Sequence, residues 1–134
     1  MPRPTYTTLT STILPSAQRT ANANSDPLNI AVNHDVFGMD AHTGYLEKGL
    51  IFVDQTAGSG NSGGQYFNIT VETAMVPAGP WLNVPLSNTI HITANGAATY
   101  GATFAGPLAG YVRVKATAVN SPDATFSASI IVGG

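Results

Sequence analysis

Short runs of alternating apolar and polar residues recur from residue 28 onward, at roughly ten-residue spacing, as in all-β proteins. Alternation with a period of two sends successive side chains to opposite faces of a strand, so one face of each run can join a core. No window supports a helix of three turns. The pattern predicts an all-β fold, a two-sheet sandwich that is jelly-roll-like or immunoglobulin-like in topology. The predicted strands cover residues 28–34, 49–54, 66–74, 89–94, 99–104, 111–119 and 125–132.

Three of these runs carry more specific expectations. The run at 66–74 alternates most cleanly and is expected to be half exposed. The run at 49–54 is apolar throughout its middle, which predicts a strand buried on both faces. The runs at 111–119 and 125–132 are separated by the turn-forming sequence Asn-Ser-Pro-Asp, and we expect them to pair as a hairpin.

The first 27 residues differ from the rest of the chain. They are rich in Thr, Ser, Asn, Pro and Ala, and Leu9, Ile13 and Leu14 are their only sizeable aliphatic residues. Because such a segment has little to bury, the sequence predicts an extended N-terminal arm at 1–27 and a β-sandwich domain at 28–134. Deleting the arm is expected to leave the fold intact.

Composition makes the surface unusual. Charged residues are 9% of the chain, against about 25% in a typical soluble domain. Sixteen Thr, nine Ser and ten Asn supply the polarity instead. Such a surface has little of the charge repulsion that keeps domains apart, and it suits a protein packed against others.

Charge and cysteine content exclude several classes of protein. The net charge is −2 and the five basic residues are scattered, so no nucleic-acid-binding patch is expected. Without cysteine, neither a disulfide framework nor a thiolate site can form. No stretch of ~18 apolar residues occurs, and the first residues lack the apolar core of a signal peptide. We therefore expect synthesis in the cytoplasm and no membrane partner.

The densest group of possible metal ligands is His34, Asp35, Asp40 and His42. Imidazole and carboxylate groups can hold a divalent ion, but this spacing matches no ligand motif. A polar loop with Asp side-chain turns is the favoured interpretation, and no cofactor is expected. No nucleophile elbow is present, so the chain is not expected to be an enzyme. A triad assembled in space around His91 remains a weak alternative.

Trp81 is the single tryptophan and permits two interpretations. The favoured one is a plug at the end of the core, because large aromatic residues tend to be buried. The other is an exposed platform with Tyr45, Tyr66 and Tyr111 that stacks on sugar rings. The glycine-rich segment at 58–64 is expected to be a flexible loop.

Arg113 and Lys115 lie two residues apart on the outward face of a predicted strand. A solvated strand face and a contact with an acidic protein surface explain this short basic strip equally well. Charge is so scarce in this chain that the pair is retained as a candidate contact.

Taken in order, these features suggest a family. A polar arm and a first strand precede a glycine-rich loop and the strand at 66–74, and the sequence GPWL follows at 79–82. GYVRV at 110–114 then leads to a closing segment, FSASII, at 126–131. This order, over roughly residues 28–132, resembles the small capsid cement, or head decoration, proteins of tailed bacteriophages.

The resemblance implies a non-enzymatic virion structural protein with a jelly-roll-like sandwich. Such proteins bind the outer face of the capsid as homo-oligomers, dimers or trimers, and cement neighbouring copies of the major capsid protein. The alternative is a carbohydrate-binding or host-attachment β-sandwich module. The residues predicted to contact the capsid or another subunit are Arg3, Tyr6, Leu9, Ile13 and Leu14 of the arm and, less strongly, Arg113 and Lys115.

Overall fold

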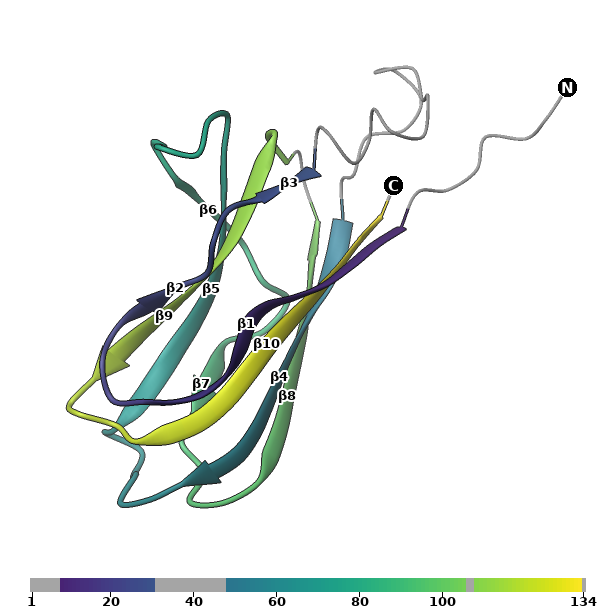
Figure 1. Ribbon diagram of the computed structural model, residues 1–134. Helices are drawn as coiled ribbons and strands as arrows, with labels where there is room; N and C mark the ends of the chain where they lie inside the picture. The colour runs from purple at the N-terminus through teal and green to yellow at the C-terminus, as the bar shows by residue number, and fades with distance from the viewer. Residues whose placement is uncertain (1–7, 31–47, 106–107, 134) are drawn as a thin grey trace, which may run out of the picture.

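The computed structural model describes residues 8–30, 48–105 and 108–133, and it shows two antiparallel sheets packed face to face (Figure 1). The predicted all-β sandwich is confirmed. Its strands are β1 (Thr8–Arg19), β2 (Ala23–Asn24), β3 (Leu28–Asn29), β4 (Lys48–Gly58), β5 (Tyr66–Ala74), β6 (Leu82–Val84), β7 (Ile90–Ile92), β8 (Ala98–Ala105), β9 (Tyr111–Val119) and β10 (Ala124–Gly133).

The strands divide into a four-stranded and a six-stranded sheet. Sheet A has the order β1-β10-β4-β8. Sheet B has the order β2-β9-β5-β6, with β3 also pairing with β9 and β7 also pairing with β5. All recorded strand pairs are antiparallel, so each sheet can present one apolar and one polar face.

The core lies between the two sheets and follows from the alternation in the sequence. In β10 every second side chain is buried along the whole strand, and β5 and β9 alternate in the same way for most of their length. At the centre, Phe67 of sheet B meets Phe126 of sheet A, with ring centroids 5.2 Å apart. Both rings are fully buried, so this contact joins the sheets in a dry interface.

The predicted boundary at residue 27 is wrong for the part of the arm that the structure describes. β1 pairs with β10 along its whole length, and Ile13 and Leu14 belong to the core cluster. These two side chains bury enough apolar surface to fix the strand, while its Thr and Ser residues suit an edge position. The segment from Thr8 is thus part of the sandwich. Residues 1–7 lie outside the described residues.

Arg19 fastens the end of β1 to its neighbour. Its guanidinium donates hydrogen bonds to the carbonyls of Phe126 and Pro15, the latter at 2.7 Å, and lies 4.8 Å from the centre of the Phe126 ring. Partial burial lowers the pKa of Arg19, but an arginine stays protonated. The single cation of this strand therefore serves the fold.

The expected hairpin between residues 111–119 and 125–132 is also wrong. Both strands form, but β9 lies in sheet B beside β5 and β10 lies in sheet A between β1 and β4. The link at 120–123 crosses from one sheet to the other, and Asn120 and Ser121 both have positive φ there. Two consecutive strands with strong alternation can face each other across a core as readily as they can pair.

The strand at β4 has one buried face, where the sequence predicted two. Ile51 and Val53 are fully buried, whereas Phe52 points outward and is 43% exposed. The continuous apolar run therefore reflects a core face plus apolar residues on the outer surface of sheet A.

The glycine-rich loop at 58–64 is tied to the body of the protein, contrary to the flexible loop expected. Asn61 is buried, and its side-chain amide donates to the carbonyl of Asp123 at 2.7 Å while its Oδ1 accepts from the N–H of Asp123 at 2.9 Å. Its backbone N–H donates to Oδ1 of Asn95 at 2.7 Å. One asparagine thus joins three connections at the same end of the sandwich.

The burial of β1 can be tested by truncating Leu14. We expect Leu14→Ala to lower the free energy of unfolding by about 2–5 kcal/mol, the usual cost of a buried Leu-to-Ala change. Urea denaturation followed by circular dichroism measures it. Ser16→Ala, an exposed change on the same strand, should stay within about 0.5 kcal/mol of wild type. A free arm would instead make both substitutions neutral.

Candidate functional site

The structure separates the predicted contact residues of the arm into two groups. Arg3 and Tyr6 lie outside the described residues. Leu9 is in β1, where its backbone pairs with β10. Ile13 and Leu14 are 9% and 4% exposed and pack into the core, so they are not available for a partner.

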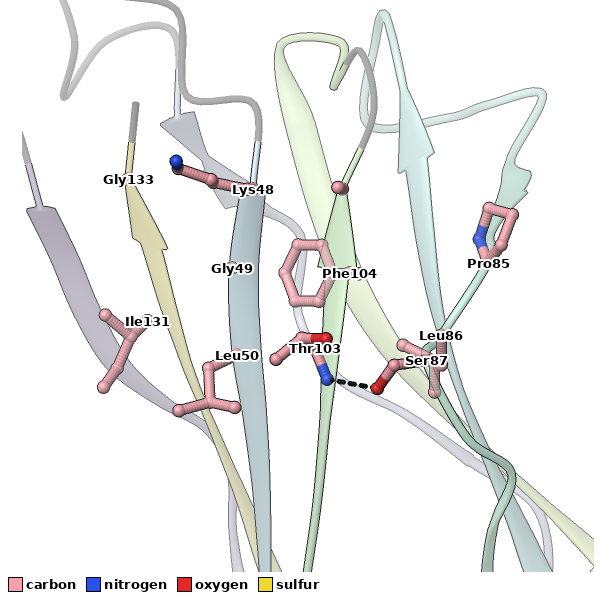
Figure 2. Close-up of a pocket in the computed structure, with 11 residues that line it drawn as sticks. Lys48, Gly49, Leu50, Pro85, Leu86, Ser87, Thr103, Phe104, Ile131 and Gly133 are labelled. Atoms are coloured by element: carbon pink, nitrogen blue, oxygen red, sulfur yellow. Dashed lines mark hydrogen bonds between the residues drawn. The ribbon is translucent and has the colours of Figure 1, made fainter.

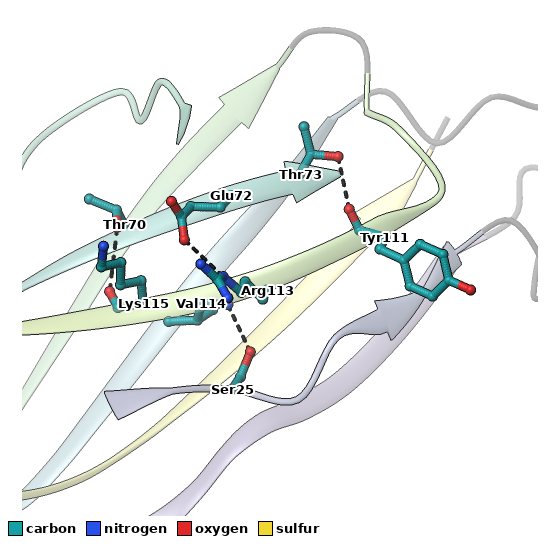
Figure 3. Close-up of polar contacts among 8 residues, drawn as sticks. All are labelled: Ser25, Thr70, Glu72, Thr73, Tyr111, Arg113, Val114 and Lys115. Carbon is teal, nitrogen blue, oxygen red and sulfur yellow. Dashed lines mark hydrogen bonds and ion pairs between the residues drawn. The ribbon is translucent and has the colours of Figure 1, made fainter. Parts of the chain in front are cut away.

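Arg113 and Lys115 lie on the outer face of sheet B, as predicted, but they differ in their surroundings. Nε of Arg113 donates to Oε1 of Glu72 at 2.9 Å (Figure 3). The Arg113 guanidinium also lies 4.3 Å from the centre of the Trp81 ring. This ion pair leaves the Arg113 side chain only 19% exposed. Lys115 forms no ion pair with another described residue. The two do not form a basic strip with two available cations.

Trp81 is neither a core plug nor an open platform. It is half-buried on the outer side of sheet B and does not belong to the core cluster. The indole folds back over Gly79, where an added Cβ would lie 2.9 Å from the ring, and the positive φ of +91° also favours glycine. Arg113 stacks on one side of the ring, and the ring packs against Gly79. Trp81 therefore supports the turn between β5 and β6 from the outer side of sheet B.

The tyrosines of the predicted platform do not gather around Trp81. Tyr66 stacks on His91, with ring centroids 4.0 Å apart, at the other end of β5. The Tyr111 hydroxyl accepts a hydrogen bond from Asn29 at 3.2 Å. Tyr45 lies outside the described residues. A single aromatic platform is therefore not seen in the described part of the chain.

Buried hydroxyls hold the segments beside sheet B in place. Ser25 exchanges two hydrogen bonds with Val114: its N–H donates to the carbonyl at 2.9 Å, and its Oγ accepts from the Val114 N–H at 2.8 Å (Figure 3). Thr73 donates to the carbonyl of Tyr111 at 2.9 Å and accepts from the N–H of Ala109 at 2.8 Å. These contacts fix the edges of the face that displays Arg113.

An apolar tip projects from the turn between β5 and β6. We define it by Met75, Val76 and Leu82, which are 83%, 51% and 67% exposed. Only one other large apolar side chain among the described residues, Phe52, is exposed. The N–H of Gly79 donates to the carbonyl of Val76 at 3.0 Å, which closes the turn. These three exposed apolar side chains flank a single turn, and exposed apolar patches mark interaction sites, so the tip is a candidate contact surface.

The outer face of sheet A is a second candidate surface. In the strand register, Phe52 lies opposite Gly101 on one side and Ser129 on the other, and Leu50 lies opposite Ile131. The Phe52 ring reaches over Gly101, where an added Cβ would be 3.8 Å from it. This part of the face is thus partly apolar, and Asp54, two residues beyond Phe52 on β4, is its nearest charged outward residue on that strand.

An apolar hollow adjoins this face (Figure 2). It has a volume of about 590 Å³ and is lined by Leu50, Phe104 and Ile131 on one side and by Pro85 and Leu86 on the other. It continues the apolar part of sheet A toward the ends of β4 and β10.

A different, polar pocket opens in sheet B. β6 pairs with residues 71–73 of β5 and β7 pairs with residues 67–69, so both short strands share one edge and the ladder is interrupted at Thr70. Between them the chain crosses to sheet A, where the N–H of Ser87 donates to the carbonyl of Thr103 at 2.8 Å. The detour leaves a cavity of about 400 Å³ beside Thr70.

We call this cavity the asparagine pocket. Side chains that both donate and accept hydrogen bonds dominate its lining, and none of the residues that line it is Lys, Arg, Asp or Glu. Its polar members are Asn68, Thr70, Asn83, Asn88, Thr89 and His91.

The described residues contain neither a group of metal ligands nor a membrane-spanning helix. Within residues 8–30, 48–105 and 108–133, no group of three or more His, Asp or Glu side chains could hold a metal ion. The candidate ligands His34, Asp35, Asp40 and His42 lie outside the described residues. No helix in the described part of the chain is long and apolar enough to cross a membrane.

Sequence reasoning missed the polar groups that organise one end of the sandwich. Gln55 is fully buried on the core face of β4. Its amide donates to the carbonyl of Ala94 at 2.8 Å, and its Oε1 accepts from the Tyr100 hydroxyl at 3.1 Å. No signal in the sequence pointed to Gln55, because it follows the predicted strand at 49–54 and that run does not alternate. In the structure, Gly58 lies so close to the Gln55 side chain and the Ala94 carbonyl that a Cβ would not fit there.

Comparison with known proteins identifies the fold. No family model matches the chain, and no curated protein matches its sequence. Among solved structures, the SPBc2 prophage-derived protein YomS is similar over 100% of this chain and 99% of its own, with a TM-score of 0.55 and 10% identity. At this identity the similarity shows a shared sandwich fold.

Two weaker structural similarities involve β-sandwich domains. The CBM22-1 xylan-binding domain of Paenibacillus barcinonensis Xyn10C covers 98% of this chain and 81% of its own, with a TM-score of 0.48 and 14% identity. A chain of infectious bursal disease virus, Gx strain, covers 96% of this chain and 33% of its own, with a TM-score of 0.45 and 11% identity.

The bracing role of Arg113 can be tested through Trp81 fluorescence. We expect Arg113→Ala to make the indole more accessible to acrylamide and to shift its emission to the red, since the stacked guanidinium is removed. Stability should fall by about 1 kcal/mol, in line with a partly exposed cation–π contact. Lys115→Ala is the matched control on the same strand. Equal quenching in both variants would show that Arg113 does not cover the ring.

Proposed function

We propose that this protein is a structural protein of a bacteriophage virion, which binds the outer surface of the capsid and cements neighbouring major capsid subunits. The sequence resemblance to cement proteins is the first support. The fold that the chain shares over its whole length with a prophage-derived protein is consistent with it. Cementing needs no catalytic group, and the proposal includes neither an enzymatic activity nor a cofactor.

The observation that carries the proposal is the apolar tip. Three large apolar side chains stand in solvent on a closed turn that Trp81 and Arg113 brace from the side of sheet B. A few apolar anchors that insert into a partner supply most of the binding energy of a typical interface. Methionine also adapts its shape to the surface it meets. We assign the tip, rather than the arm, as the main capsid contact.

The outer face of sheet A supplies the proposed contact between copies of the protein. Along its centre, Leu50, Phe52 and Ile131 lie among Ser and Thr residues, and only Lys48 and Asp54 carry charge on the outward positions of β4, β8 and β10. Two such faces would bring only these two charged side chains, one of each sign, into the contact from each copy. An oligomer joined in this way would present several tips to the capsid, and multivalent attachment strengthens weak single contacts.

The second candidate function is a carbohydrate-binding or host-attachment module. The aromatic platform expected for it is not seen, but the asparagine pocket favours a sugar-binding role at a different place. The two functions do not exclude each other, because the pocket and the tip share no residue.

Capsid attachment can be tested with charges placed on the tip. We expect the double variant Met75→Asp/Leu82→Asp to bind capsids of the parent phage at least about tenfold more weakly, since each anchor residue contributes about 2 kcal/mol. Co-sedimentation with purified capsids measures binding and stoichiometry. Ala97→Asp adds a charge to the exposed β7–β8 turn and should bind as wild type does. Undiminished binding of the double variant would remove the tip from the interface.

Self-association can be tested separately by light scattering. We expect the wild-type protein to be a dimer or trimer and Phe52→Asp to shift the mass to that of a monomer, because the new carboxylate would be buried without a partner. The variant should still fold, because Phe52 lies outside the core, although its unfolding free energy should fall by about 1 kcal/mol with the loss of a strand-favouring residue. A monomeric wild-type protein at all concentrations would contradict the oligomer.

A further inference from the structure

The asparagine pocket has the chemistry of a binding site for hydroxyl groups. A side-chain amide offers donors and an acceptor side by side, which matches a pair of neighbouring hydroxyls that each donate and accept. The amides of Asn68 and Asn83 make no hydrogen bond to another described residue. Their hydrogen-bonding capacity is therefore available to a ligand.

Two other polar groups of the pocket are held in fixed positions. Asn88 donates to the carbonyl of Gly101 at 3.2 Å and accepts from the hydroxyl of Ser87 at 3.0 Å. His91 stacks on the Tyr66 ring, with an angle of 22° between the two planes. Polar groups that are oriented before binding lose less freedom when a ligand arrives.

The lining also restricts which ligands fit. None of the residues that line the pocket is Lys, Arg, Asp or Glu, so a phosphate or carboxylate would find no fixed cation in the lining and an ammonium group no fixed anion. An extended peptide would need an open strand edge, whereas β6 and β7 already occupy this edge of β5 on both sides of Thr70. A volume of about 400 Å³ lies at the small end of the range for ligand pockets, which is about 300–1,000 Å³.

We propose that the asparagine pocket binds a ring of a neutral glycan through the amides of Asn68, Asn83 and Asn88. The proposal rests on the second candidate function, the carbohydrate-binding module, for which it names a binding site and a class of ligand. It is independent of capsid attachment. A single pocket with a few hydrogen bonds should bind with a Kd on the order of 1 mM. Many copies on one particle would raise the effective affinity.

The test uses NMR titration of the full chain with uncharged and charged oligosaccharides. The probes are mannotriose, cellotetraose and N,N′,N″-triacetylchitotriose, with trigalacturonate as the anionic comparison. We expect at least one neutral probe to shift the side-chain amide signals of Asn68, Asn83 and Asn88, and trigalacturonate to shift none of them. If no neutral probe shifts these signals at 10 mM, roughly ten times the expected Kd, the proposal is wrong.

Variants show whether the pocket itself is responsible. We expect Asn68→Ala/Asn83→Ala to weaken binding of the active probe at least about tenfold, and urea unfolding to confirm that the variant is folded. The matched control is Asn24→Ala, an exposed asparagine on β2 of the same sheet and outside the pocket. Equal weakening in the control, or an undiminished affinity in the double variant, would place the sugar elsewhere.

Capsid co-sedimentation separates this proposal from the cementing function. Asn68→Ala/Asn83→Ala should attach to capsids as wild type does, because the tip is unchanged. Sugar binding without capsid attachment by the wild type would overturn cementing alone, and capsid attachment without sugar binding would overturn the pocket alone. A shift of the pocket amides by a peptide from the capsid protein, with no response to any sugar, would make the pocket a protein contact.

Discussion

The contact between Phe67 and Phe126 is the constraint on which the other features depend. It joins the two sheets at the centre of an interface that has neither disulfides nor buried ion pairs among the described residues, so apolar packing must hold the sheets together. Both rings belong to strands, β5 and β10, in which buried and more exposed side chains alternate without interruption around them. Once these inward positions are committed, the outward positions of the same strands form part of the two outer faces of the sandwich.

Those outward positions are mostly polar, and few of them are charged. The hydroxyl and amide groups of Thr, Ser and Asn form hydrogen bonds with water. Some of the few charged side chains on the sheets form contacts within the protein. Arg19 secures β1 to β10, and Arg113 is shared between Glu72 and Trp81. The surfaces left for partners are therefore an apolar tip, a flat face on sheet A and a pocket of amides. Each is suited to contacts that lack charge, whether with protein or with sugar.

The strands themselves were largely predictable. Residues 66–74 and 111–119 form β5 and β9 with the predicted bounds, because alternation over nine residues reports burial of one face directly. Pairing was not predictable to the same degree. Between residues 11 and 19, where burial is described, Ile13 and Leu14 are the buried aliphatic residues, and the place of this segment beside β10 depends on a partner more than 100 residues away. Likewise, the asparagine pocket exists because β6 and β7 share one edge of β5, which no local pattern in 82–92 indicates.

The sequence by itself determined that the chain is an all-β sandwich, that its surface carries little charge, and which face of each strong strand is buried. These properties depend on the side-chain period of two and on composition, which are local. Only the tertiary structure decided that residues 8–19 belong to the sandwich, that β9 and β10 lie in opposite sheets, and that Trp81 braces a turn. Those outcomes depend on which strands meet. Alternation specifies the face that a strand buries but not the neighbour with which it forms hydrogen bonds.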